Sequence, residues 1–343
     1  MINIIILGST GSIGRQTLEV IRKHKKKFKV VGLACNSNAK LLNAQAKKFH
    51  TKNKVLVSKT PKRLATLIQK TKADLVVNAI SGSAGLVPSK LTLKAGKILV
   101  LANKESLVLE GKALMNLARK NKTEIFPLDS EHHAVLRLLQ TKGLTKYDPR
   151  RVKKITLTAS GGPFFETPKS DFAKITPRQA LKNPNWSMGP KILIESALLL
   201  NKGFEVIEAH HLFKCPLNKI HAIIDRKSYV HAIVEFSRTA KAPAQTLALA
   251  YKPTMKTVIE DTLVKFHHDT RSPETKLKSR KLKFLEGPAL KKHKFHQISH
   301  AKFPAFGRTL AAFRKGQIEK FYKTSEKNIQ KFLEEKIRFP EIV

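Results

Sequence analysis

The chain has 343 residues, of which 41% are hydrophobic, so it is long enough for two or three packed domains. It carries 66 Lys and Arg against 25 Asp and Glu, a formal net charge of +41. The two cysteines, Cys35 and Cys215, form no CxxC pair, which excludes a disulfide framework and a cysteine zinc knuckle. The apolar opening meets Gly8 too early for a signal peptide, and no run reaches membrane-spanning length. We therefore expect a cytoplasmic protein with no membrane partner.

The basic residues are mostly Lys and are spread along the chain, with clusters at 24–29, 276–283 and 291–296. Such a charge is typical of a solvated surface with a compositional bias, or of a surface that binds polyanions. No RNA-binding aromatic motif and no zinc finger accompanies the clusters, which makes a dedicated nucleic-acid site the weaker interpretation.

The first third of the chain alternates apolar, β-branched runs with helical patterns. This alternation predicts a parallel sheet with crossover helices on both faces, over residues 1–123. The expected strands lie near 2–7, 28–34, 54–58, 74–80 and 97–103, and the first two helices near 15–24 and 40–48.

The first predicted strand runs directly into a glycine-rich turn, GSTGSIG, and then a helix. Glycines at such a turn permit close approach of a pyrophosphate, and the N–H groups at the helix start face the anion. The alternative is a tight turn that binds no ligand. We predict a dinucleotide at this turn, contacted by Gly8, Thr10, Gly11, Ser12 and Ile13, with Gly14 packing the helix against the strand.

The residues after the second predicted strand contain no Asp or Glu to hold a ribose 2′-hydroxyl. This absence indicates NADP rather than NAD, with Ser37, Asn38 or Lys40 near a 2′-phosphate.

A second α/β segment begins near Glu124, with strand candidates at 124–129, 153–159, 219–225 and 229–236. We assign residues 124–256 to a second domain. The pattern loosens over 257–303, which we interpret as a linker region, and helical periodicity resumes over 304–343.

Acidic side chains are scarce, so those that cluster invite a functional interpretation. Asp129 and Glu131 follow an apolar run, and they share one face if the strand continues. Asn201 and Glu205 are four residues apart on a predicted helix, with Lys202 beside them. Asp129, Glu131 and Glu205 would offer three oxygen ligands without a Cys/His cluster, which suits Mg²⁺ or Mn²⁺. Ordinary surface acids remain an equal alternative.

Two more stretches place polar groups in predicted loops. The turn that begins at Ser160, SGGP, resembles an anion-binding turn, although it can equally be a simple strand terminator. Trp186 stands in the turn-rich segment 183–189, where it is either a core anchor or the apolar tip of a lid.

These motifs together resemble the 1-deoxy-D-xylulose 5-phosphate reductoisomerase family. The resemblance covers most of residues 1–260, and LDSEH with NKGxE carries most of its specificity. The matching stretches are GSTGSIG at 8–14, AGLVPS at 84–89, LANKESLV at 101–108, LDSEH at 128–132, SGGPF at 160–164, NPNWSMG at 183–189 and SALLLNKGFEVIEA at 196–209.

The resemblance implies an α/β fold with an N-terminal Rossmann-like dinucleotide-binding domain, an α/β catalytic domain and a C-terminal helical domain. It implies that Asp129, Glu131 and Glu205 bind one divalent cation, and that Lys104 and Glu131 handle protons. The implied substrate contacts are Ser130, Ser160, Trp186, Met188, Ser196, Asn201, Lys202 and His231. The LANKES stretch adds Asn103, Lys104 and Glu105 to the implied cofactor contacts.

The implied activity is the rearrangement and reduction of 1-deoxy-D-xylulose 5-phosphate to 2-C-methyl-D-erythritol 4-phosphate, a step of non-mevalonate isoprenoid biosynthesis. It requires NADPH and Mn²⁺ or Mg²⁺, and the family suggests a homodimer. The alternative from another class is a diverged relative, weakly active or inactive, that serves as a basic anion- or nucleic-acid-binding protein.

Four stretches depart from the family pattern. Asn183 stands where the family usually has a lid His, and residues 36–38 replace Gly-Lys-Asn. Residues 225–227, Asp-Arg-Lys, replace a frequent His-Pro-Gln, and 323–327 replace Asn-Ala-Ala-Asn-Glu. The chain also stops at Val343, before the family's last helices. We therefore expect reduced activity and a C-terminal helical domain that lacks its last helices.

Overall fold

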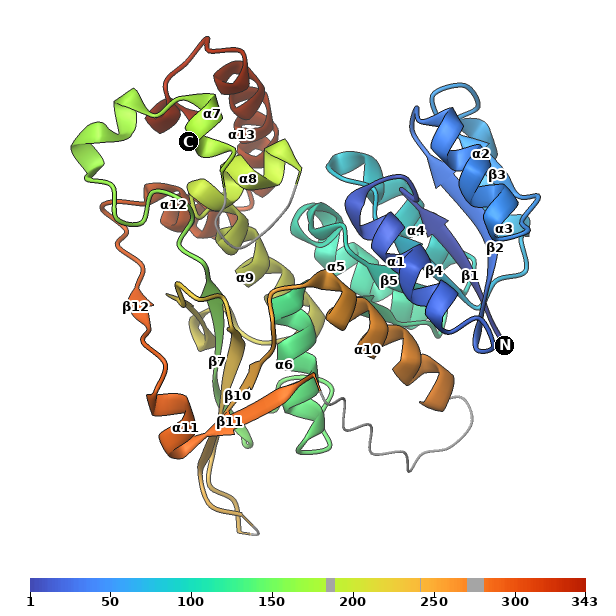
Figure 1. The fold of residues 1–343 in the computed structure, drawn as a ribbon. Helices are drawn as coiled ribbons and strands as arrows, with labels where there is room; N and C mark the ends of the chain where they lie inside the picture. The colour runs from blue at the N-terminus through green and yellow to red at the C-terminus, as the bar shows by residue number, and fades with distance from the viewer. Residues whose placement is uncertain (183–188, 241, 270–280) are drawn as a thin grey trace. The chain divides into compact units, whose positions relative to one another are not determined.

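A computed structural model describes residues 1–182, 189–240, 242–269 and 281–343. The chain divides into two compact units (Figure 1). The first unit combines Met1–His133 with Thr254–Lys281, and the second combines Ala134–Pro253 with Leu282–Val343. Within the described residues, no helix has the length and apolar character needed to cross a membrane.

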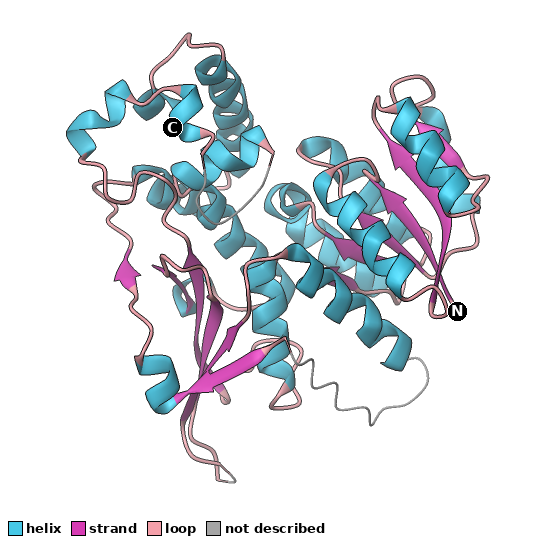
Figure 2. Cartoon of the chain, in the orientation of Figure 1, coloured by secondary structure: helices cyan, strands magenta, loops and turns pink. Residues whose placement is uncertain are grey.

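The first unit contains a six-stranded sheet in the order β3-β2-β1-β4-β5-β6, in which every pair is parallel. This order is that of the Rossmann fold, with crossover helices between successive strands (Figure 2). The predicted parallel sheet is confirmed. Its strands are β1 (Ile2–Leu7), β2 (Phe28–Cys35), β3 (Lys54–Leu56), β4 (Leu75–Asn78), β5 (Ile98–Leu101) and β6 (Ile125–Pro127).

The crossover helices form because each has an apolar stripe to bury against the sheet. In α1, Leu18 and Ile21 are three residues apart and almost fully buried. The helices of this unit are α1 (Ser12–Lys23), α2 (Ala39–Lys48), α3 (Lys62–Lys70), α4 (Leu86–Lys94), α5 (Lys104–Lys120), the start of α6 (Ser130–Gln140) and α10 (Met255–Asp269), with the short η1 (Ser83–Gly85).

The second unit contains a mixed sheet in the order β11-β10-β9-β7-β8-β12. Only β7 and β8 pair in parallel, and the other neighbours are antiparallel. The strands predicted near 153–159, 219–225 and 229–236 are confirmed, whereas β10, β11 and β12 were not predicted. The strands are β7 (Val152–Ala159), β8 (Ile220–Ile224), β9 (Val230–Phe236), β10 (Gln245–Ala250), β11 (Lys283–Glu286) and β12 (His296–Gln297).

Helices of the second unit pack closely at α9, where Gly203 lies against Thr309 of α12. A Cβ on Gly203 would lie 2.8 Å from the Thr309 Cβ, so only glycine allows this approach. The predicted return of helices after Pro304 is confirmed by α12 and α13. The unit's helices are α7 (Pro177–Ala180), α8 (Pro190–Ala197), α9 (Leu200–Phe213), α11 (Gly287–Lys291), α12 (Pro304–Arg314) and α13 (Ile318–Leu333), with η2 (Lys169–Lys174), η3 (Leu217–Lys219) and η4 (Phe339–Ile342).

The described part of 257–303 differs from the predicted linker. It contains most of α10, which packs against α1 in the first unit, and then β11, α11 and β12. The weak periodicity arises because α10 buries residues around much of its circumference, including Val258, Ile259 and Leu263.

The strand predicted at 124–129 ends earlier, at Pro127, and it does not continue through Glu131. β6 ends at Pro127, and Glu131 lies in the first turn of α6. The Asp129 carboxylate accepts the backbone N–H of Glu131 at 3.2 Å, which satisfies a donor that the new helix would leave unpaired. The two acids therefore approach each other through a helix cap and not through a shared strand face.

Candidate functional site

The glycine-rich turn lies between β1 and α1, as the sequence predicts. Gly8 adopts a φ of 77°, and a Cβ there would lie 2.5 Å from the Ala79 carbonyl oxygen. A Cβ on Gly14 would lie 2.3 Å from the Gly8 carbonyl oxygen. Gly11 precedes α1, which has no side-chain cap and no acid in its first turn. The turn thus presents backbone N–H groups at the carboxyl end of β1, where an anion is favoured.

Side chains around the turn form hydrogen bonds that stabilise its conformation. Ser9 is buried, and its hydroxyl donates to the Gln45 side-chain oxygen at 2.8 Å. The Gln45 amide donates back to the Ser9 carbonyl at 2.8 Å. Burial raises the pKa of the Cys35 thiol, although a hydrogen bond with Thr10 lowers it in part. This thiol is therefore a packing group at neutral pH.

The turn after β2 is exposed and contains no acid. Ser37, Asn38 and Lys40 are all exposed. The Asn38 side chain caps α2 by accepting the Leu41 N–H at 3.0 Å, so one of its acceptor positions is already used. The capping role was not predicted, although an Asn directly before a helix is a recognisable signal.

Asn103 and Glu105, predicted as cofactor contacts, hold the loop that follows β4. The Asn103 amide donates to the carbonyl oxygens of Ile80 at 2.8 Å and Gly82 at 2.7 Å. One Glu105 oxygen accepts the Gly82 N–H at 3.1 Å and the other accepts from Asn103 at 2.9 Å. Both side chains are buried, so they define the shape of the loop at the carboxyl edge of the sheet.

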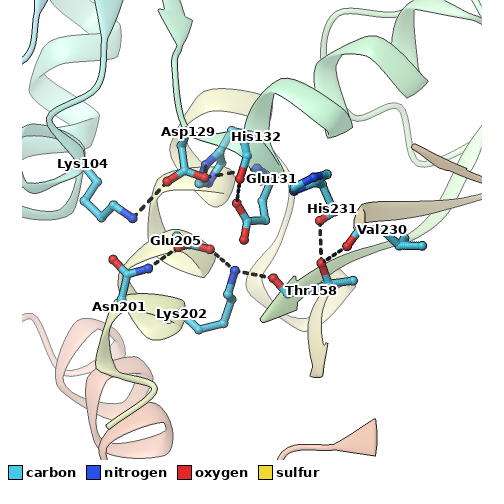
Figure 3. Close-up of polar contacts among 11 residues, drawn as sticks. Lys104, Asp129, Glu131, His132, Thr158, Asn201, Lys202, Glu205, Val230 and His231 are labelled. Carbon is cyan, nitrogen blue, oxygen red and sulfur yellow. Dashed lines mark hydrogen bonds and ion pairs between the residues drawn. The ribbon is translucent and has the colours of Figure 1, made fainter. Parts of the chain in front are cut away.

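The acids predicted as metal ligands in the first unit gather where β6 gives way to α6. The Lys104 ammonium donates to Asp129 at 3.0 Å, and both side chains are only 13% exposed (Figure 3). The His132 Nδ1 lies 3.1 Å from the other Asp129 oxygen, and Ser130 donates to Glu131. The buried His132 was not singled out from the sequence, although it belongs to the LDSEH motif.

Behind these acids, α10 contributes a buried partner to α6. The His133 Nε2 lies 2.8 Å from an Asp261 oxygen, and the side chains are 2% and 4% exposed. Sequence reasoning missed Asp261 because it lies 128 positions from His133, inside the segment expected to be a linker.

The acid predicted in the second unit lies on α9 and is fully engaged there. The Asn201 amide donates to one Glu205 oxygen and the Lys202 ammonium donates to the other (Figure 3). Lys202 also donates to the Thr158 carbonyl at 2.5 Å, at the end of β7. Both Lys202 and Glu205 are nearly inaccessible, at 3% and 2%. The i, i+4 spacing places Asn201 and Glu205 on one helix face, where their side chains meet.

The loop that starts at Ser160 follows β7 and lies against the end of α8. Gly161 and Gly162 have φ values of 82° and 68°, and a Cβ on Gly162 would lie 3.0 Å from the Ser196 carbonyl oxygen. The structure thus brings the backbones of the Ser160 loop and Ser196 together. It also brings in Arg226, whose guanidinium donates to the carbonyl oxygens of Ser160 at 2.5 Å and Gly162 at 2.9 Å.

His231 is buried within the second unit. It is 2% exposed, stacks on Tyr251 with ring centroids 3.9 Å apart, and its Nε2 lies 3.2 Å from the Tyr251 carbonyl oxygen. Its carbonyl accepts from Thr158, next to the Lys202 contact (Figure 3). These contacts support the neighbouring strand end. The predicted lid residues Trp186 and Met188, and the departure at Asn183, lie outside the described residues.

The parallel sheet and its glycine-rich turn define a Rossmann-like protein with a second α/β unit. The family model described as 1-deoxy-D-xylulose 5-phosphate reductoisomerase matches residues 4–65 and 51–111, and the model of its C-terminal domain matches 125–213. A solved reductoisomerase in complex with NADPH, fosmidomycin and magnesium is 31% identical, with a TM-score of 0.83, over 100% of this chain and 87% of that one. The chain belongs to the 1-deoxy-D-xylulose 5-phosphate reductoisomerase family.

Other relatives agree with this assignment. The reductoisomerase from Zymomonas mobilis in complex with NADPH is 30% identical, with a TM-score of 0.81, over 99% of this chain and 89% of that one. Relatives of the same name from Caldanaerobacter subterraneus and Pelodictyon phaeoclathratiforme are 46% and 42% identical over 255 residues, 69% of this chain. Those alignments span 65% of the length of each relative.

Proposed function

We propose that this protein converts 1-deoxy-D-xylulose 5-phosphate to 2-C-methyl-D-erythritol 4-phosphate with NADPH and a divalent cation. The observation that carries the proposal is the pairing of acids with lysines in both units: Lys104 with Asp129, and Lys202 with Glu205. Such pairs suit a site that binds a metal together with an anionic substrate. The solved relatives in complex with NADPH, fosmidomycin and magnesium support the same activity.

The glycine-rich turn fits NADPH. Gly8 and Gly14 leave no room for a side chain, so the turn is tight and α1 starts close against it, as in dinucleotide-binding turns. The turn after β2 offers Ser37, Asn38 and Lys40 without an acid that would repel a 2′-phosphate. Gly11, Ser12, Ile13 and Thr10 complete the proposed cofactor contacts, and Asn103 and Glu105 fix the adjacent loop.

Asp129, Glu131 and Glu205 are the proposed metal ligands. Three carboxylates are hard oxygen donors, which fit Mg²⁺ or Mn²⁺. When bound, the cation supplies Lewis-acid polarisation of the substrate's oxygens. Lys104 and Glu131 are the proposed proton-handling groups, because each lies beside the proposed metal ligands in the first unit.

The second unit supplies the proposed substrate contacts. Ser160, Ser196, Asn201 and Lys202 would bind the phosphate and hydroxyl groups, together with Ser130 from the first unit. His231 would act through the strand end that holds Lys202, since its own ring is buried against Tyr251. Trp186 and Met188 are proposed as the lid on the strength of the family motif. We further infer a cytoplasmic location and a homodimer. Light scattering after gel filtration would test the homodimer.

The test is NADPH oxidation by the full chain. We expect absorbance at the NADPH wavelength to fall only when substrate and Mn²⁺ or Mg²⁺ are both present, and to stop with excess chelator. We expect kcat/KM for NADPH to exceed that for NADH by about tenfold or more, because the turn after β2 lacks an acid. An absence of NADPH oxidation with every cation tried, together with nucleic-acid binding at moderate salt, would support a basic binding protein instead.

A further inference from the structure

The turn between β8 and β9 is where the chain replaces the family's His-Pro-Gln with Asp225, Arg226 and Lys227. Asp225 is buried and organises the turn. One of its oxygens accepts the Lys227 N–H at 3.0 Å, and the other accepts the N–H groups of Tyr229 and Val230, both at 2.9 Å. A turn fixed by three hydrogen bonds to one carboxylate gives the residue after Asp225 a defined direction.

Arg226 points back onto the loop that follows β7. Its Nη1 donates to the carbonyl oxygens of Ser160 and Gly162, and its guanidinium lies 5.0 Å from the centre of the Phe165 ring. The Asp225 N–H donates to the Ala159 carbonyl at 2.9 Å, so the turn and the loop are joined at two points. Stacking and donation together hold the guanidinium in one place.

The loop that Arg226 holds has an unusual backbone. Gly161 and Gly162 both have positive φ, and the Gly162 N–H donates to the Ser160 hydroxyl oxygen at 3.3 Å. Left-handed glycines have wide conformational freedom, so such a loop loses entropy when it binds an anion in one conformation. Fixing the two carbonyl groups that flank Gly161 removes that freedom before the ligand arrives.

We propose that Arg226 is a positioning residue that preorganises the Ser160 loop for the phosphate group of the substrate. The inference rests on the proposed function, because it names the group that the loop receives. Arg226 acts through the loop, and its positive charge also favours a dianion nearby. A Pro at this position, as the family usually has, supplies no donor for the two carbonyl oxygens.

Steady-state kinetics and calorimetry of Arg226→Met test the proposal. We expect the KM for 1-deoxy-D-xylulose 5-phosphate to rise about tenfold, with kcat and the NADPH affinity changed less than about twofold. The affinity for inorganic phosphate should fall by a similar factor, and that for 1-deoxy-D-xylulose, which lacks the phosphate, should not change. Lys227→Met is the matched control, because it removes the same charge from an exposed neighbour and should leave all values within about twofold.

Arg226→Lys should recover part of the phosphate affinity, since one ammonium can donate to both carbonyl oxygens but cannot stack on Phe165 as the planar guanidinium does. If Arg226→Met does not fold, Arg226→Gln carries the same comparison, since it also removes the charge. An equal loss of affinity for the ligands with and without phosphate, or no loss for either, would overturn the proposal. A wild-type chain without turnover would refute the proposed function alone, because the effect of Arg226→Met on inorganic phosphate binding decides the positioning role separately.

Discussion

At the scale of single residues, the proposed ligands are not isolated acids. Asp129 contacts Lys104, and Glu205 contacts Asn201 and Lys202. A buried carboxylate without such partners would carry a large desolvation cost.

Glu205→Gln tests the ligand role of this residue. The variant keeps the shape and an acceptor for Lys202, but a neutral amide binds a hard cation less well than a carboxylate. We expect activity to fall at least about tenfold and the Mn²⁺ concentration for half-maximal rate to rise. Titration of the rate with Mn²⁺ measures both effects.

Glu319→Gln is the control for this substitution. Glu319 is 68% exposed and forms a surface ion pair with Lys323, so its loss should not affect the Mn²⁺ titration. Kinetics and a metal titration that match wild type in Glu205→Gln would eliminate Glu205 as a ligand.

At the scale of elements, the hydrophobic pattern of the sequence did not reveal that α10 is a packed helix of the first unit. It packs against α1, and three of its side chains pair with other elements of the first unit: Glu260 with His24 at 2.9 Å, Lys256 with Glu19 at 2.5 Å, and Asp261 with His133 at 2.8 Å. These pairs differ in burial, so they should differ in their contribution to stability.

Asp261→Ala tests the buried pair. It removes the partner of the His133 ring, which is 2% exposed, and we expect the free energy of unfolding of this unit to fall by about 1–3 kcal/mol. Urea denaturation monitored by circular dichroism measures the change. Glu19→Ala, which removes an acid that is 47% exposed, should change it by less than about 1 kcal/mol. Equal effects of the two substitutions would contradict the importance of burial here.

At the scale of the whole molecule, acid pH should weaken the fold through His211, near the end of α9. Burial, and the positive charge of His210 when protonated, lower the pKa of His211 from 6.5 to about 4. Its ring lies against His210 and Phe313, with centroids 4.9 Å and 5.5 Å away. Between these two pKa values, His211 is neutral in the folded chain and protonated in the unfolded chain.

Proton linkage gives the direction in which stability changes with pH. Above pH 6.5 His211 is neutral in both states and contributes no pH dependence; between pH 6.5 and about 4 only the unfolded state takes up the proton, so stability falls as pH falls. We expect this group to remove about 3 kcal/mol of unfolding free energy across that window. His211→Phe should flatten this part of the profile, measured by urea denaturation at several pH values. His50→Asn, at an exposed position, should leave the profile unchanged. If His211→Phe lost as much unfolding free energy as wild type between pH 6.5 and about 4, His211 would not be the group responsible.

The local sequence determined the elements whose signals are short-range. Strong alternation predicted the parallel sheet, and the glycines predicted a turn whose Gly8 and Gly14 leave no space for a Cβ. The i, i+4 spacing predicted a shared helix face for Asn201 and Glu205, on which the two side chains form a hydrogen bond. These features follow from backbone periodicity and sterics, which act over a few residues.

Only the tertiary structure decided the features that depend on distant partners. The pairing of His133 with Asp261 across 128 positions and the contact of Arg226 with the Ser160 loop across 66 positions carry no local signal. Each depends on hydrogen bonds that form when remote backbone segments meet, and these bonds fix the conformation of the residues around the proposed site. Residue identity thus determined the chemistry that is available, and long-range packing determined which groups support it.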